Sequence, residues 1–136
     1  MNSRLLAFGS IILLLTTLSC KKTVESNVIV GKWKLVEQYN GYANGGNFQW
    51  NAVPSEYSHI LTFTENGNYQ KTEAINGTQS NCIGTYLLQA DNKLEINSNC
   101  NTVTERSFIS ELTTKTLVLD YSVREGVIRY RYAASQ

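Results

Sequence analysis

The chain has 136 residues, of which 42% are hydrophobic and 17% are charged, and its 12 Lys and Arg residues stand against 11 Asp and Glu residues. That length fits one domain. The near-neutral balance argues against a nucleic-acid partner, because electrostatic nucleic-acid binders carry a clear basic excess. Ordinary apolar content and a single Pro beside 8 Tyr residues favour a folded, strand-rich chain over a disordered one.

The first 19 residues have the pattern of an export signal. Arg4 supplies a positive start, and residues 5–18 form an apolar run. A membrane-spanning helix needs about 20 apolar residues, so this run is too short to span a bilayer and fits the apolar core of a secretory signal. We therefore expect residues 1–19 to be a signal peptide.

Cys20 follows this signal in a segment that resembles the lipobox of bacterial lipoproteins. The segment is Thr17-Leu18-Ser19-Cys20, in which Thr17 stands where Leu is more usual. The resemblance implies that Cys20 is lipidated and becomes the first mature residue, with acyl chains such as palmitate holding the protein on a membrane. Residues 20–27 would then be the lipidated cysteine and a tether. The alternative is an ordinary signal peptide with an incidental Cys, or an uncleaved anchor.

The charges directly after Cys20 bear on the location of the protein. Surface-displayed lipoproteins of some Gram-negative lineages resemble one another in an acidic run at this place. Here the place is held by Lys21-Lys22. We therefore expect attachment to the outer membrane on its periplasmic face rather than on the cell surface.

Apart from Cys20, the chain has two cysteines, Cys82 and Cys100. An exported protein lies in an oxidising compartment, where such an even pair can form a disulfide. Two runs with alternating apolar residues lie between them and flank a turn centred on Asp91. This turn pairs Leu88 with Leu94, Tyr86 with Ile96, Gly84 with Ser98, and Cys82 with Cys100. The register predicts a disulfide. A metal site is not expected, because the chain has one His and no acidic cluster near the cysteines.

The rest of the chain divides into short alternating segments joined by turns, with Asn66-Gly67 as the sharpest hairpin signal. The expected strands are residues 30–39, 57–64, 69–75, 83–89, 93–98, 103–112, 116–122 and 127–132. Eight strands with mostly short links predict an all-β domain over residues 28–136, an eight-stranded antiparallel up-and-down barrel. A β-sandwich is the alternative.

Motifs in these strands resemble the small bacterial lipocalin-like lipoproteins, which belong to the calycin group of eight-stranded barrels. The motifs are Gly31-Lys32-Trp33, which matches the family's G-x-W, residues 61–69 (LTFTENGNY), residues 84–88 (GTYLL) and residues 93–96 (KLEI). The resemblance covers about residues 28–133. It implies the lipocalin-like barrel and makes Gly31 and Trp33 structural signature residues.

The resemblance also assigns a role to the last strand. In the family, the Trp of G-x-W plugs the closed end of the barrel, and a basic side chain of the last strand lies across its ring. Arg129 and Arg131 are the candidates for that contact with Trp33. The alternative is that both arginines simply face solvent.

An eight-stranded barrel has an interior that side chains just fill, or that holds one small ligand. The expected inward positions are bulky: Trp33, Leu35, Leu61, Phe63, Tyr86, Leu88, Phe108, Leu119 and Tyr130. They predict a filled core with at most a shallow pocket at one mouth. The long link from Asn40 to Glu56 carries aromatic residues, and the candidate ligand-binding residues are Tyr42, Phe48, Trp50 and Tyr57. Alternatively, these rings only cover an open barrel end.

Catalysis finds little support in the sequence. His59 is the only His and shares a strand face with Leu61, so we expect a packed residue rather than a base. No phosphate-binding loop is present. We expect a monomeric, non-enzymatic protein without a cofactor. The resemblance implies a small hydrophobic or amphipathic ligand at the barrel mouth; the alternative is an envelope protein-interaction barrel, such as an inhibitor or accessory subunit, with a packed core.

Overall fold

The computed structural model describes residues 26–136 of the chain. The predicted signal peptide (residues 1–19) and the predicted lipidation site Cys20 lie outside the described residues, as does most of the predicted tether. Within residues 26–136, no helix combines the length and the apolar character that crossing a membrane would require.

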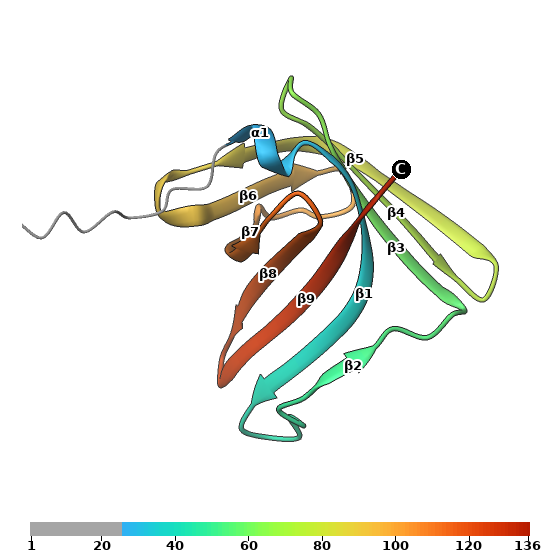
Figure 1. Ribbon diagram of the computed structural model, residues 1–136, viewed down its shortest axis with the longest axis vertical. Helices are drawn as coiled ribbons and strands as arrows, with labels where there is room; N and C mark the ends of the chain where they lie inside the picture. The colour runs from blue at the N-terminus through green and yellow to red at the C-terminus, as the bar shows by residue number, and fades with distance from the viewer. Residues whose placement is uncertain (1–25) are drawn as a thin grey trace, which may run out of the picture.

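The described chain is almost entirely β-structure (Figure 1). Its elements are α1 (Ser26–Ile29), β1 (Gly31–Tyr42), β2 (Trp50–Ala52), β3 (Tyr57–Phe63), β4 (Asn68–Ile75), β5 (Thr78–Leu88), the 3₁₀ turn η1 (Ala90–Asn92), β6 (Lys93–Ser98), β7 (Glu105–Leu112), β8 (Thr116–Val123) and β9 (Gly126–Ser135). From β3 onward each strand pairs antiparallel with the next, and β1 pairs with both β3 and β9. This closure confirms the predicted up-and-down barrel of eight strands.

A short additional strand, β2, lies in the long link between β1 and β3 and is not predicted from the sequence. It pairs with Glu37–Tyr39 of β1, on the edge where β3 pairs with Gly31–Lys34. β2 and β3 therefore lie end to end along one edge of β1. This pairing draws the long link against the barrel wall.

One strand departs from the predicted inward and outward positions. In β7 a bulge lies between Ile109 and Glu111, because Ile109 pairs with Leu119 whereas Glu111 pairs with Val118. Ile109 is buried and Phe108 is 43% exposed. The prediction that Phe108 points inward is wrong, since the extra residue of the bulge interrupts the regular alternation.

The β5–β6 hairpin has the predicted register. The pairs are Gly84 with Ser98, Tyr86 with Ile96, and Leu88 with Leu94. Cys82 and Cys100 form a disulfide with 5.5 Å between their Cα atoms, which confirms the predicted bond. Cys82 is buried in the wall, whereas Cys100 lies beyond the end of β6 and is exposed.

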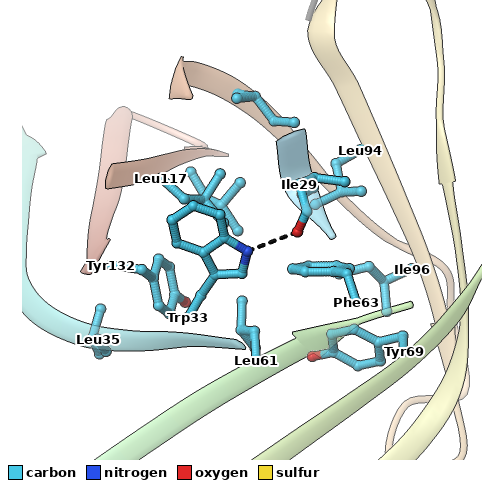
Figure 2. Packing of buried hydrophobic residues seen from close by; sticks show 12 residues of the cluster. Ile29, Trp33, Leu35, Leu61, Phe63, Tyr69, Leu94, Ile96, Leu117 and Tyr132 are labelled. Atoms are coloured by element: carbon cyan, nitrogen blue, oxygen red, sulfur yellow. Dashed lines mark hydrogen bonds between the residues drawn. The ribbon is translucent and has the colours of Figure 1, made fainter. Parts of the chain in front are cut away.

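The closed end of the barrel is filled by an apolar cluster beneath α1 (Figure 2). The indole Nε1 of Trp33 donates a hydrogen bond to the carbonyl of Ile29 at 2.7 Å, and both residues are buried. Gly31 has a φ of +137°, which L side chains rarely adopt, so glycine allows the chain to turn from α1 into β1. The other members of the cluster are Leu35, Leu61, Phe63, Tyr69, Leu94, Ile96, Ile109, Leu117, Leu119 and Tyr132.

The two ends of the barrel are defined by the pairing of β1 with β9. Lys32 pairs with Ser135 at the closed end, next to α1, and Tyr42 pairs with Gly126 at the opposite end, which is the mouth. The described chain therefore enters and leaves the barrel at the closed end (Figure 1). This arrangement keeps both ends of the described chain away from the mouth.

Candidate functional site

The half of the barrel nearest the mouth contains a cavity of about 450 Å³. A cavity of this size can hold one small organic molecule. Its lining consists of Leu35, Gln38, Tyr57, His59, Leu61, Tyr69, Lys71, Glu73, Glu105, Tyr121, Ile128, Tyr130 and Tyr132. Leu35, Leu61, Tyr69 and Tyr132 also belong to the buried cluster, so they form the floor on which the cavity rests.

Strand alternation explains which side chains reach the cavity. Every second residue of β3 points inward, which brings Tyr57, His59 and Leu61 to the lining. The same spacing selects Tyr69, Lys71 and Glu73 from β4, and Ile128, Tyr130 and Tyr132 from β9. In β1 the interval from Leu35 to Gln38 is three residues, because β1 has a bulge after Leu35.

A hydrogen-bonded chain of three side chains lies on one wall of the cavity. The Tyr57 hydroxyl donates to Oε1 of Glu73 at 2.5 Å, and the Tyr57 oxygen lies 3.3 Å from Nδ1 of His59. Because Tyr57 donates its single proton to Glu73, Nδ1 of His59 is the donor in the second bond. Burial raises the pKa of Tyr57, and the hydrogen bond and charge of Glu73 raise it further. The phenol therefore keeps the proton that this bond needs.

His59 is a neutral imidazole in this setting. Burial lowers the pKa of His59 from 6.5 to about 4; the charge of Glu73 opposes this change, and Lys71 adds to it. Among the described residues, Nε2 of His59 is buried without a hydrogen-bond partner. The ring packs edge-on against Tyr132, with 5.7 Å between centroids. These contacts fit a packed residue, in keeping with the expectation for His59.

A second carboxylate reaches the cavity from the start of β7. Oε1 of Glu105 accepts a hydrogen bond from the Tyr121 hydroxyl at 2.9 Å, and Oε2 accepts one from the side-chain amide of Asn101 at 3.2 Å. Burial raises the pKa of Tyr121, and Glu105 contributes to the rise through its charge and its hydrogen bond. Glu105 is thus held in place from both sides by neutral donors.

The charges on the lining do not balance. Glu73 and Glu105 are acidic, and Lys71 is the one basic side chain among the lining residues. Nζ of Lys71 lies 4.0 Å from Oε2 of Glu73, a loose ion pair. With His59 neutral, the described lining carries a formal charge of −1.

Five tyrosines form most of the aromatic wall of the cavity: Tyr57, Tyr69, Tyr121, Tyr130 and Tyr132. Burial raises the pKa of every one of them, and the two lining carboxylates raise the pKa of Tyr69 and Tyr130 further. All five are therefore neutral phenols at physiological pH. They offer ring faces and hydroxyl groups to a ligand.

Of the four predicted ligand-binding residues, the described lining includes Tyr57. Phe48 is 58% exposed on the long link, and Tyr42 ends β1, where its carbonyl accepts a hydrogen bond from Gly46. Trp50 lies in β2 on the outer wall. The described lining therefore does not include Tyr42, Phe48 or Trp50, and pairing of β2 with β1 holds Trp50 along the outer wall instead of across the mouth.

Polar residues of the long link do reach the rim of the barrel. Asn47 and Asn51 line a smaller hollow of about 270 Å³ together with Gln38 and Tyr57. Because Gln38 and Tyr57 also line the main cavity, this hollow adjoins the mouth. The link thus contributes amide groups to the entrance.

Arg129 and Arg131 lie on the outer face of β9. Arg131 forms an ion pair with Glu37, and its guanidinium lies over the ring of Trp50, 3.9 Å from the centroid. Arg129 forms an ion pair with Asp120 at 3.1 Å. Both arginines therefore help to fasten neighbouring elements on the outside of the barrel.

The prediction that one of these arginines covers Trp33 is wrong. Tyr130 and Tyr132 point into the barrel, so the alternating residues Arg129 and Arg131 must point outward. Trp33 is instead covered by Ile29 of α1, whose carbonyl accepts its indole hydrogen bond (Figure 2). The alternative reading, in which the arginines face outward, is the one that agrees with the structure.

The charged residues of the cavity, Lys71, Glu73 and Glu105, are not predicted from the sequence. Lys71 and Glu73 alternate with Tyr69 and could have been found by that spacing, but charged side chains usually mark the solvent face of a strand. Glu105 stands three residues before Phe108, so in a regular strand the two side chains point to opposite faces. Predicting that Phe108 points inward therefore places Glu105 on the outer face. The predicted filled core describes the closed half of the barrel, whereas the half near the mouth is open and polar.

Elsewhere in the described part of the chain, no hollow combines charged groups with aromatic rings as the interior cavity does. A depression of about 510 Å³ lies on the outer face of β3, β4 and β5, and its lining is Thr62, Thr64, Asn68, Tyr69, Gln70, Ile83, Gly84 and Thr85. Within residues 26–136, no three His, Cys, Asp or Glu side chains gather where they could hold a metal ion. The interior cavity, which combines charges with aromatic rings, is therefore the candidate site.

Comparisons with known proteins agree with this architecture. Residues 29–119 match the family of lipocalin-like domains. The crystal structure of a lipocalin-like protein from Bacteroides uniformis ATCC 8492 is similar, with a TM-score of 0.61 and 15% sequence identity over 79% of this chain and 98% of that chain. A search of curated proteins finds no match. Because the family match spans more than half of the sequence, the chain belongs to the lipocalin-like domain family.

Proposed function

We propose that this protein is a non-enzymatic binding protein that holds one small amphipathic molecule inside the barrel, near the mouth. The observation that carries the proposal is the cavity of about 450 Å³. A protein-interaction barrel with a packed core would not need such a space, whereas a small-molecule site needs several hundred Å³. The open interior thus favours a ligand carrier over an inhibitor or accessory subunit.

The lining suggests how such a molecule would lie. Leu35 and Leu61 offer an apolar floor, and nearer the mouth Ile128 lies among polar groups. An apolar portion of the ligand would gain about 25 cal/mol for each Å² that it buries against the floor. Its polar portion would meet Gln38, Glu73 and Glu105 instead of bulk water.

Anchoring of the protein to a membrane is a further part of the proposal. A lipid on Cys20 would lie six residues before Ser26, where α1 begins at the closed end of the barrel. Six extended residues span at most about 22 Å. The closed end would therefore stay near the membrane, on the periplasmic face of the outer membrane, and the mouth would open toward the aqueous space.

Binding is tested with N-phenyl-1-naphthylamine, a neutral fluorescent probe whose emission rises in an apolar site. The test variant is Ile128→Trp, which places a larger side chain in the cavity lining. The control is Leu87→Trp, which adds the same ring at a position that is 57% exposed. We expect the wild type and Leu87→Trp to bind the probe, and Ile128→Trp to lose most of the affinity. Equal binding by both variants would overturn the proposal, and so would a wild type that binds neither this probe nor a charged molecule with an apolar chain.

Anchoring is tested separately, with the full chain expressed in a Gram-negative host that is fed radiolabelled palmitate. We expect label on the wild type and none on Cys20→Ala. Protease added to intact cells should leave the wild type whole and digest it only after the outer membrane is opened. Digestion in intact cells would move the protein to the cell surface, and an unlabelled wild type would remove the anchor from the proposal.

A further inference from the structure

The lining of the cavity holds more acidic than basic groups. Glu73 and Glu105 are both partly buried, and they enter from β4 and β7, which β5 and β6 separate in the sheet. Each accepts a hydrogen bond from a tyrosine hydroxyl, Tyr57 for Glu73 and Tyr121 for Glu105. Neutral donors orient the two carboxylates without cancelling their charge.

Lys71 offsets this charge only in part. It lies 4.0 Å from Oε2 of Glu73, and no other basic side chain lines the described cavity. Glu105 has neutral partners in Tyr121 and Asn101. The cavity without a ligand thus keeps one negative charge that its own lining does not neutralise. Opposite charges interact more strongly in such a partly enclosed space than in bulk water.

The aromatic rings reinforce the same preference. Five tyrosines share the cavity lining with the carboxylates, and the face of a neutral aromatic ring attracts cations. An anionic ligand would have to face two carboxylates and the negative faces of these rings, with Lys71 as its one basic partner in the lining. A neutral ligand would leave the unbalanced charge as it is.

We propose that the ligand of this cavity is an organic ammonium ion with an apolar portion, that is, an amphipathic amine. Its charged group lies among Glu73, Glu105 and the tyrosine rings, and its apolar portion lies against Leu35 and Leu61. This inference rests on the proposed binding function and adds the charge of the ligand to it. It makes the protein a receptor for amines rather than for fatty acids.

The test compares two probes with the same ten-carbon chain by titration calorimetry: decylamine, protonated at pH 7, and decanoate. Both are used below the concentrations at which they form micelles. We expect the wild type to bind decylammonium at least about tenfold more tightly than decanoate, since one favourable charge contact is worth about that factor. Equal affinities, or tighter binding of decanoate, would overturn the inference.

The decisive variant is the double substitution Glu73→Gln with Glu105→Gln. Glutamine can still accept the tyrosine hydrogen bonds, and Lys71 would then be the charged group left in the lining, so the preference should reverse toward decanoate. The control Glu95→Gln removes an acidic residue that pairs with Arg106 on the outer face, and it should keep the wild-type preference. Near-ultraviolet circular dichroism checks that each variant is folded.

The outcomes separate this inference from the proposed function. If N-phenyl-1-naphthylamine binds and Ile128→Trp blocks it, but the two charged probes bind equally, the protein is a ligand carrier without a preference for amines. A preference for decylammonium that survives in the double variant would overturn the assignment of Glu73 and Glu105. If the wild type binds none of the three probes, the proposed function falls together with this inference.

Discussion

The guanidinium of Arg131 lies 3.9 Å from the centre of the Trp50 ring, on the outer wall of the barrel. Trp50 in turn packs against Tyr39, with 5.6 Å between ring centroids, and Arg129 lies 5.4 Å from the centre of the Tyr39 ring. Cationic groups and rings from β1, β2 and β9 thus form one continuous stack. The stack fastens the long link between β1 and β3 to the wall.

Replacing Trp50 with Ala removes the middle of this stack. We expect the free energy of unfolding to fall by about 1–2 kcal/mol, because one cation–π contact and one aromatic pair are lost on a partly exposed surface. Urea denaturation followed by circular dichroism measures the change. Binding of N-phenyl-1-naphthylamine should be unaffected, since Trp50 is outside the cavity.

The matched control for that variant is Phe48→Ala in the same link. Phe48 is 58% exposed, so its loss should change the free energy of unfolding by less than about 0.5 kcal/mol. If Trp50→Ala keeps its stability and loses probe binding, Trp50 belongs to the entrance after all, and the outer stack has no role in holding the link.

Trp33 stabilises the closed end of the barrel both by filling space and by the hydrogen bond from its indole Nε1 to the carbonyl of Ile29. In Trp33→Phe the buried carbonyl of Ile29 loses its hydrogen-bond donor. An unsatisfied buried polar group and a smaller core side chain together should lower the free energy of unfolding by about 2–4 kcal/mol. Trp50→Phe, which makes the same exchange on the outer wall, should cost less than about 1 kcal/mol. Equal costs in urea denaturation would mean that the bond to Ile29 contributes nothing.

The disulfide between Cys82 and Cys100 closes a loop with a sequence separation of 18. In the chain-entropy description, a crosslink of this length stabilises the folded state by about 3 kcal/mol. We expect the double variant Cys82→Ala with Cys100→Ala to lose that amount in urea denaturation. The wild type in excess dithiothreitol should unfold at nearly the same urea concentration as the double variant. A double variant as stable as the oxidised wild type would contradict this role.

Local patterns in the sequence were sufficient to predict most of the barrel. The turn at Asp91 determines the register of its hairpin, and with it the facing of Cys82 and Cys100. Bulges limit this kind of reasoning, because the extra residue puts the residues before it and those after it out of step, without a signal in composition. The bulge after Ile109 means that Phe108 does not share a face with Leu112, and the pairing of β2 with β1 depends on contacts distant in sequence.

The cavity was less predictable than the barrel for a physical reason. Glu73 and Glu105 are charged, and a charged residue in a strand normally faces water. Here they face inward because Tyr57 and Tyr121, from other strands, supply hydrogen bonds that lower the cost of burial. Each partner lies on the neighbouring strand of a hairpin, β3 beside β4 and β7 beside β8, so the register and facing of both strands must be known before the pairs can be recognised.

His59 should make the stability of the protein depend on pH. The groups that face it are Tyr57 on its own strand, Glu73 and Lys71 on β4, and Tyr132 on β9. Together, with burial dominant, they place the folded-state pKa of His59 near 4, below the value of 6.5 in the unfolded chain. Between these values the unfolded chain binds a proton that the folded chain does not.

The sign of the effect follows from that difference. Above pH 6.5 His59 is neutral in both states and its contribution to stability is complete; as the pH falls toward 4 the contribution is lost, and below 4 the loss levels off. At pH 5 the loss relative to pH 7.5 should be about 2 kcal/mol. Urea denaturation of the wild type and of His59→Gln at both pH values measures the contribution of His59 to this pH dependence. The acidic residues titrate in both proteins, so their contribution cancels in the comparison. Parallel pH profiles would contradict the prediction, as would a His59 ring resonance in the nuclear magnetic resonance spectrum of the folded wild type that titrates near pH 6.5.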